Sequence, residues 1–422
     1  MARLVLTASF VTSVLFAFAA CGGGDDPSPV DASDAATGGE EATSDAGALP
    51  DGAASDAAVD APVDASDDGD AAAEVPAVRF IGRFDTTDPA GPKVAWPGAQ
   101  IVARFTGTEV KVTLAETAGG FPTDRSHWDV SIDGTIDPTP LALTLGQATY
   151  TLASGLGAGM HTVELYKRSE AKAGVTQFLG FEFPSGQLRP PPPARTRRIE
   201  FLGDSNANGY GIEGVAPCDY TSATQNERKT FGALTAASLM ADHHNLAYSG
   251  VGVSLNYVRT DPNVMEVVYD RALPDSAGNA NDFTKFNPDV VWVTLGGNDW
   301  DGEDAANPTP PANFQAKYAD LVTVLRARRP NAHIVCAVGA SLNDFYPQNM
   351  ANNYNAYTNA KNAITAVVNA RVAGGDNKIY VYDYTPRAVP ADRTGCHSHF
   401  NAAKHASLAT ETVAFIKSKT GW

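Results

Sequence analysis

Cysteine is scarce in this chain, with four residues among 422. So few thiols exclude a small scaffold held together by disulfides, and the folded part must therefore rely on ordinary hydrophobic cores. Positive charge is also in short supply, because 31 Lys and Arg face 48 Asp and Glu. A phosphate-binding surface needs clustered Lys and Arg. The composition therefore argues against a nucleic-acid partner.

The acidic excess is concentrated in one segment. Residues 22–75 hold 15 acids and no Lys or Arg, which leaves 33 acids against 30 bases in residues 76–422. The segment repeats Asp-Ala pairs and has almost no large apolar side chains. It buries too little surface to offset the entropy of ordering, and its charges repel one another. We therefore expect residues 22–75 to be a disordered, extended tether.

The first residues have the pattern of an export signal. Arg3 precedes an apolar run that ends before Cys21 and is shorter than the roughly 20 residues of a membrane span. Phe18-Ala19-Ala20-Cys21 resembles the lipobox of bacterial lipoproteins, which implies that Cys21 is acylated. Residues 1–21 are interpreted as a lipoprotein signal peptide, with ordinary cleavage and a chance cysteine as the alternative. We expect an exported protein held at the bacterial cell envelope only by lipid, and Gly22 favours the outer membrane.

Residues 76–187 are predicted to form a β-sandwich of the jelly-roll type. Apolar and polar side chains alternate in short stretches such as residues 100–105 and 109–114, and Gly, Pro and Asp separate the stretches. This segment shows no catalytic constellation, and whether it binds sugar stays open. Residues 188–195 follow with four consecutive prolines, which favour a stiff polyproline II linker.

Residues 196–422 are predicted to form an α/β/α three-layer domain. Five apolar runs typical of buried strands alternate with helical stretches; the runs cover residues 199–202, 245–248, 290–295, 334–338 and 379–382. This alternation favours a five-stranded parallel sheet with helices on both faces. In such sheets ligands bind beyond the carboxyl ends of the strands, so candidate functional residues are sought there.

Four residues that suit acyl-transfer chemistry follow these strands. Ser205 lies in Gly203-Asp204-Ser205-Asn206 after the first strand, and Gly250 lies in Ser249-Gly250-Val251-Gly252 after the second. Asn298 lies in Gly296-Gly297-Asn298-Asp299 after the third, and His399 comes before the last helix. Each block alone is ordinary turn chemistry. The four in this order resemble the SGNH (GDSL-type) hydrolase superfamily.

The sequence around these blocks resembles carbohydrate esterase family 2; the similar stretches are residues 201–211, 247–252, 269–274 and 286–291. The resemblance covers about residues 76–422, because that family joins a jelly-roll domain to an SGNH domain. It implies an enzyme, a carboxylic ester hydrolase that removes acetyl groups, with a preference for 6-O-acetyl groups, from plant cell-wall polysaccharides such as glucomannan or xylan. The expected partner is an acetylated polysaccharide or oligosaccharide. No cofactor and no metal are expected, and the oligomeric state is open.

The resemblance also gives each site residue a role. Ser205 is the expected nucleophile and His399 the base that activates it. The backbone N–H groups of Ser205 and Gly250 and the side-chain amide of Asn298 are the expected oxyanion hole. An acetyl-serine intermediate would form and then be hydrolysed.

One feature departs from the family pattern. The superfamily places an aspartate three residues before the histidine, and family 2 often has one two residues before it, but Cys396 and His397 occupy these positions. A Ser-His dyad whose base is oriented by a backbone carbonyl is therefore favoured. His397 as the base and Asp392 as the orienting acid stay open as alternatives.

Three further residues receive a role. Trp300 directly follows the Asn298 block and either stacks on a sugar ring or packs the loop. The resemblance implies a disulfide between Cys218 and Cys396, and an exported chain permits one. No Cys/His spacing indicates zinc.

Two other functions remain open. The first is another SGNH activity, such as a lipase or thioesterase, which would need an apolar acyl groove. The second is a surface lipoprotein that binds carbohydrate with an inactive SGNH unit, and the missing aspartate keeps this alternative open.

Overall fold

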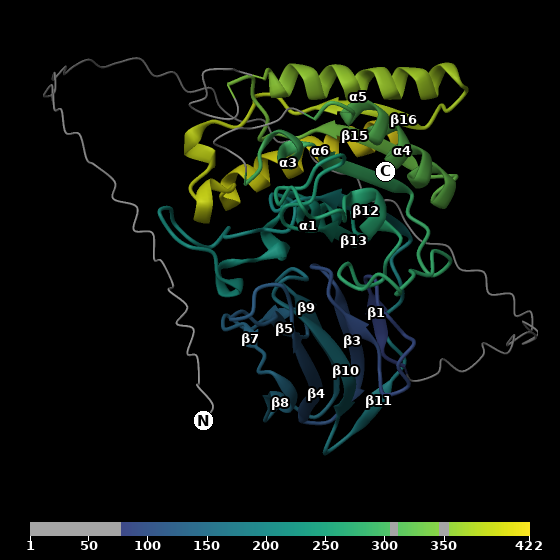
Figure 1. The fold of residues 1–422 in the computed structure, drawn as a ribbon. Coiled ribbons are helices and arrows are strands. Elements are labelled where there is room, and N and C mark those ends of the chain that lie inside the picture. Colours follow the sequence, from purple (N-terminus) through teal and green to yellow (C-terminus); the bar gives the residue numbers. More distant parts are fainter. Residues whose placement is uncertain (1–76, 304–310, 346–353) are drawn as a thin grey trace, which may run out of the picture. The chain divides into compact units, whose positions relative to one another are not determined.

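The computed structural model describes residues 77–303, 311–345 and 354–422 (Figure 1). The predicted signal peptide, Cys21 and the tether lie outside these residues and stay predictions. Within the described ranges, none of the helices combines the length and the apolarity that crossing a membrane would require.

The N-terminal part is the predicted β-sandwich. One sheet has the order β1-β3-β9-β5-β6, with β11 added beside β3 and β7 beside β5, and the second has the order β2-β10-β4-β8. All of these pairs are antiparallel. The strands are β1 (Arg79–Ile81), β2 (Lys93–Val94), β3 (Gln100–Thr106), β4 (Glu109–Ala118), β5 (His127–Ile132), β6 (Thr135–Ile136), β7 (Leu141–Ala142), β8 (Gly146–Ser154), β9 (Met160–Lys167), β10 (Gly174–Glu182) and β11 (Gln187–Arg189).

The period-two pattern places apolar side chains from both sheets in one core. Ile101 and Trp128 come from the first sheet and meet Leu114 from the second, and all three are buried. The start of the predicted linker is wrong, because Leu188 and Arg189 pair with β3 as part of β11. Hydrogen bonding to a sheet edge competes with a free polyproline conformation, and the four prolines begin only at Pro190.

The C-terminal part is the predicted parallel sheet between two helical layers. Its strand order is β13-β12-β14-β15-β16, a doubly wound arrangement in which β12 neighbours both the second and the third strand of the domain. The strands are β12 (Arg197–Gly203), β13 (Ala241–Ala247), β14 (Val290–Leu295), β15 (His333–Val338) and β16 (Ile379–Asp383).

Both faces of this sheet are covered. Along β14, Val291 and Val293 pack in the core cluster that includes α2, α4 and α5, whereas Trp292 packs in the cluster that includes α1 and α6. The helices are α1 (Phe231–Ser238), α2 (Met265–Tyr269), α3 (Gly297–Trp300), α4 (Phe314–Arg328), α5 (Ala356–Ala373) and α6 (Ala402–Thr420). A central strand buried on both faces explains why its sequence is a continuous apolar run.

A buried ion cluster joins the sandwich to the α/β part. The carboxylate of Glu200 on β12 accepts hydrogen bonds from Arg83 of the sandwich at 3.1 Å and from Arg329 at 2.9 Å. The Tyr269 hydroxyl also donates to this carboxylate, at 2.8 Å. Despite burial, the two guanidinium groups lower the pKa of Glu200 to about 2. The cluster therefore keeps a charged carboxylate between the two parts.

Candidate active site

Three of the predicted site residues lie beyond the carboxyl ends of neighbouring strands. β13, β12 and β14 are adjacent and parallel, so Gly250, Ser205 and Asn298 emerge at the same edge of the sheet. His399 lies between a short 3-10 turn, Cys396–Ser398, and the start of α6. The rule that chemistry gathers at this edge therefore located the candidate residues.

Ser205 and His399 are in direct contact. The Nε2 atom of His399 lies 2.8 Å from the Ser205 Oγ atom, and its Nδ1 atom lies 3.1 Å from the backbone oxygen of Cys396. A carbonyl oxygen only accepts hydrogen bonds, so Nδ1 carries the proton and Nε2 presents its lone pair to the serine hydroxyl. This is the arrangement of a nucleophile and its general base.

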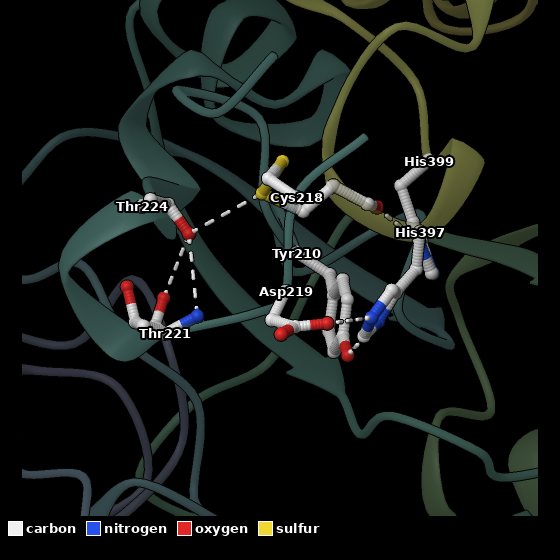
Figure 2. The surroundings of a disulfide bond; sticks show 8 residues. Tyr210, Cys218, Asp219, Thr221, Thr224, His397 and His399 are labelled. Carbon is white, nitrogen blue, oxygen red and sulfur yellow. Dashed lines mark hydrogen bonds and ion pairs between the residues drawn. A yellow bond between two sulfur atoms is a disulfide. The ribbon is translucent and has the colours of Figure 1, made fainter. Parts of the chain in front are cut away.

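The Cys396 backbone that orients His399 is held in place by a disulfide and by a hydrogen bond. Cys396 forms a disulfide with Cys218, and Figure 2 shows this bond with His397 and His399 nearby. The Cys396 N–H donates to the backbone oxygen of Gly211 at 3.1 Å. Gly211 has a φ of +59°, and a Cβ at this position would lie 2.5 Å from the Cys396 Cβ. A glycine is therefore required where the two segments meet.

The alternative base, His397, and the alternative orienting acid, Asp392, have other partners. The exposed His397 lies 3.0 Å from the Tyr210 hydroxyl and 3.4 Å from an Asp219 carboxylate oxygen (Figure 2). Asp392 accepts the backbone N–H of Val389 at 2.9 Å and lies 3.7 Å from Lys404. Within the described residues, no carboxylate hydrogen-bonds to the imidazole of His399. The geometry therefore favours the dyad over a triad.

The expected oxyanion donors are available for a ligand. Among the described residues, the backbone N–H groups of Ser205 and Gly250 donate no hydrogen bond. The Asn298 Nδ2 atom donates to the Val251 oxygen at 2.9 Å, which uses one of its two hydrogens and leaves the other. Gly250 has a φ of +83°, a backbone conformation that favours glycine.

A buried carboxylate ties the Gly250 loop to the Asn298 turn. Asp299 accepts backbone N–H groups of Val253 at 3.0 Å, Ser254 at 2.7 Å and Leu255 at 3.0 Å. An oxyanion hole needs donors that do not move during the reaction. Asp299 supplies that rigidity by linking α3 to the loop after β13.

A buried glutamate of the sandwich also fixes this loop, and sequence reasoning missed it. Glu170 lies in the loop between β9 and β10, and its carboxylate accepts the Ser249 N–H at 2.9 Å and the Ser249 hydroxyl at 2.6 Å. Asn208 donates to the same hydroxyl at 3.0 Å. Ser249 directly precedes Gly250, so Glu170 sets where the Gly250 N–H points. Nothing local in the sequence distinguishes Glu170 from an ordinary loop residue.

A lysine from the same loop borders the site. The Lys172 Nζ atom lies 4.7 Å from the ring centroid of Tyr248 and 5.7 Å from that of Phe121. It lies 3.7 Å from the position that a Cβ on Gly250 would occupy. The sandwich therefore contributes a positive charge beside an expected oxyanion donor.

Of the two roles left open for Trp300, the structure favours packing over stacking on a sugar. Its side chain is 4% exposed and packs against Phe314, with ring centroids 4.7 Å apart. Burying a large indole ring is favourable, and the α3 turn directs the side chain of Trp300 into the core. Tyr210 is the aromatic residue beside the base, with its ring 4.2 Å from that of His399.

Comparison with known proteins accounts for both parts of the chain. The family model described as carbohydrate esterase 2 N-terminal matches residues 80–192, and that of the GDSL-like lipase/acylhydrolase family matches residues 201–406. The solved structure of a family two carbohydrate esterase from Clostridium thermocellum, in complex with cellohexaose, is 34% identical with a TM-score of 0.72. That similarity covers 82% of this chain and 100% of the solved one. This chain belongs to carbohydrate esterase family 2.

Curated relatives of this family 2 chain are esterases by name. A cellulase/esterase of Acetivibrio thermocellus is 34% identical over 348 residues, which are 82% of this chain and 40% of the relative. The chain thus spans less than half of that relative's length. An acetylxylan esterase/glucomannan deacetylase of Cellvibrio japonicus is 29% identical over 276 residues, which are 64% of this chain and 74% of the relative.

The free cysteine of the described residues and the aspartate beside the nucleophile are both buried, and neither belongs to a metal site. Cys336 on β15 is a buried free thiol. Asp204, next to the nucleophile, is buried and accepts the Asn206 N–H at 2.9 Å, and burial raises its pKa to about 6. Within the part of the chain that the structure describes, no group of three or more His, Cys, Asp or Glu residues could hold a metal ion.

Proposed function

We propose that this family 2 chain is a serine esterase that removes O-acetyl groups from polysaccharides such as glucomannan or xylan. The single observation that carries the proposal is the 2.8 Å contact between the Ser205 Oγ and the His399 Nε2, beside unengaged N–H groups. The names of the curated relatives support the substrate class. Export and anchoring through Cys21 belong to the proposal as well, supported by the lipobox-like sequence that ends there.

The reaction follows from the positions of these groups. The Ser205 oxygen attacks the acetyl carbonyl carbon while His399 takes the hydroxyl proton, and the carbonyl oxygen becomes an oxyanion. The N–H groups of Ser205 and Gly250 and the amide of Asn298 stabilise that charge. The bond from the acetyl carbon to the sugar oxygen then breaks, and His399 returns the proton to the sugar. Water, activated by the same histidine, converts acetyl-Ser205 to acetate and free serine.

Acetate release tests this function. Acetylated glucomannan and acetylated xylan should both lose acetate, and the ratio of their kcat/KM values will rank the polysaccharides. Long-chain acyl esters test the lipase alternative, and Ser205→Ala gives the uncatalysed background. Serine-dependent release from long-chain esters that exceeds release from both polysaccharides would contradict the proposal. Sugar binding without serine-dependent release would support the inactive binding protein instead.

The pH profile should reflect the unusual base. Burial lowers the pKa of His399 to about 4, from about 6.5 for a free histidine. A protonated imidazole cannot accept the serine proton, so kcat/KM should rise with pH through an apparent pKa near 4 and stay level to neutral pH. Rates on a soluble acetyl ester between pH 3.5 and 8, with folding checked by circular dichroism at each pH, measure this. A limb centred at 6.5 or above would contradict it.

Glu170 should affect turnover as a positioning residue. Glu170→Ala removes both acceptors of Ser249, so the Gly250 N–H loses its fixed direction, and we expect kcat to fall about 10²-fold with little change in KM. Glu170→Gln keeps the shape and an acceptor oxygen and should recover most of the rate.

Glu182→Ala is the matched control, because Glu182 is an exposed glutamate of the same sandwich. It should leave both kinetic constants unchanged. Equal loss in Glu170→Ala and Glu170→Gln, or a change confined to KM, would show that Glu170 does not act through the direction of the Gly250 N–H.

A further inference from the structure

A cavity lies at the opposite edge of the parallel sheet from the nucleophile. It has a volume of about 350 Å³ and is lined by residues of both the sandwich and the α/β part. Arg198 and Asp242 line it from the amino ends of β12 and β13, whereas Ser205 lies beyond the carboxyl end of β12. Its volume falls within the roughly 300–1,000 Å³ of small-molecule sites.

The floor of this cavity has an excess of positive charge. Arg83 and Arg329 line it, both are almost fully buried, and both pair with the single carboxylate of Glu200. Two guanidinium groups therefore share one anion. Backbone oxygens accept the other N–H groups of both side chains, so their hydrogen bonds are largely satisfied, but the net positive charge of the group would still attract an anionic ligand.

The rim adds two cations with few partners. Within the described residues, the Arg198 guanidinium has no ion pair or hydrogen bond. The Lys285 ammonium donates to the Thr86 hydroxyl at 3.1 Å, and the carboxylate of Asp282 attracts it without a direct ion pair among the described residues. Of the two acids in the lining, Asp242 pairs with Arg79, and Asp282 accepts from Thr284. The Arg198 guanidinium is thus available to a ligand, and the Lys285 ammonium can add a contact because it is held by one hydroxyl and no direct ion pair.

Two buried polar atoms in the lining lack a partner. The Arg83 Nε and the His244 Nδ1 make no hydrogen bond to the described residues, although His244 is only 6% exposed. Buried polar atoms are almost always satisfied by protein, water or ligand. Because burial lowers the pKa of His244 well below its usual value, its ring is neutral, and each nitrogen can take part in a neutral hydrogen bond.

Aromatic rings supply the remaining wall. Phe80, Phe84 and Phe286 line the cavity, and the His244 ring stacks on Phe286 with centroids 3.6 Å apart. Phe80 is 37% exposed. Aromatic faces suit the apolar face of a sugar ring, and guanidinium groups suit a carboxylate because both are planar and can form two parallel hydrogen bonds.

We propose that this cavity binds a hexuronate, a sugar ring that carries a carboxylate, through Arg198, Lys285 and the Arg83–Arg329 floor. Acidic side groups of a polysaccharide are the source that fits this chemistry. The site does not depend on the esterase reaction, because it lies at the other edge of the sheet.

Calorimetric titration of the full chain carrying Ser205→Ala tests the site. We expect saturable binding of glucuronate and at least tenfold weaker binding of glucose. Arg198→Ala/Lys285→Ala should weaken glucuronate binding at least tenfold. Arg104→Ala/Lys417→Ala, which removes the same charge outside the cavity, should leave the affinity unchanged. When the two double variants are made in the chain that keeps Ser205, neither should alter acetate release. A failure of glucuronate binding can therefore be told apart from a failure of the proposed esterase function.

Three results would overturn the proposal. The first is the absence of saturable glucuronate binding. The second is equal affinity of the two double variants, which would place binding elsewhere. The third is acetate binding as tight as glucuronate binding, which would show that the cavity recognises a bare carboxylate and not a sugar acid.

Discussion

Ser205→Ala is expected to lower kcat for acetyl-ester hydrolysis by about 10⁵–10⁶-fold, the scale seen when a serine hydrolase loses its nucleophile. The reason is structural: the Ser205 hydroxyl lies 2.8 Å from the Nε2 atom of the base, the atom that is free to accept its proton. His399→Ala should cost a similar factor, because the hydroxyl is a weak nucleophile until its proton is removed. The double variant should be no slower than either single one, since the two residues act as a unit. Single-turnover rates on one soluble ester measure all three.

His397→Gln and Asp392→Asn are the matched controls for the dyad. Neither side chain contacts Ser205 or His399, so each change should alter kcat by no more than a few-fold. A loss in Asp392→Asn as large as that in His399→Ala would mean that a carboxylate orients the base in solution. A comparable loss in His397→Gln would reassign the base itself.

Glu200→Ala should have the largest effect on stability. Its removal leaves Arg83 and Arg329 buried without an anion, which costs about 3–5 kcal/mol in other proteins when a buried pair is broken. The Tyr269 hydroxyl also loses its acceptor. The free energy of unfolding in urea measures the loss. Asp270→Ala breaks an exposed ion pair with Arg328 and should cost no more than about 1 kcal/mol.

The same cluster predicts how stability changes in acid. Its two arginines hold the folded pKa of Glu200 at about 2, below the unfolded value of about 4.3. The stabilisation is therefore fully present above pH of about 4.3 and is lost as the pH falls toward 2. Glu200→Gln should be less sensitive to pH over this window than the natural chain. Equal sensitivity, or equal stability of Glu200→Ala and Asp270→Ala, would contradict the role assigned to the cluster.

The fold class could be predicted from the sequence because local patterns record burial. The alternation in residues 109–114 reflects a strand with one buried face, and the apolar run of β14 reflects a strand buried on both. The positions of Ser205, Gly250 and Asn298 followed from the same reasoning, since residues after parallel strands meet at one edge. These features depend on neighbours within a few residues along the chain.

Contacts between distant segments could not be predicted in this way. Glu170 reaches Ser249 across 79 residues, and Trp300 faces Phe314 because the α3 turn directs it inward. In each case the partner is chosen by how two separately formed elements pack, and a single sequence carries no local trace of that choice.

The sequence by itself determined the five parallel strands in their order along the chain and the candidate nucleophile and base, and through the family resemblance the three expected oxyanion donors. Only the tertiary structure decided that the Cys396 carbonyl orients His399, that the sandwich supplies Glu170 and Lys172, and that Trp300 is buried. The physical reason is that periodicity and turn chemistry are short-range, whereas orientation of a side chain in a site is set by packing and hydrogen bonds between segments far apart in the chain.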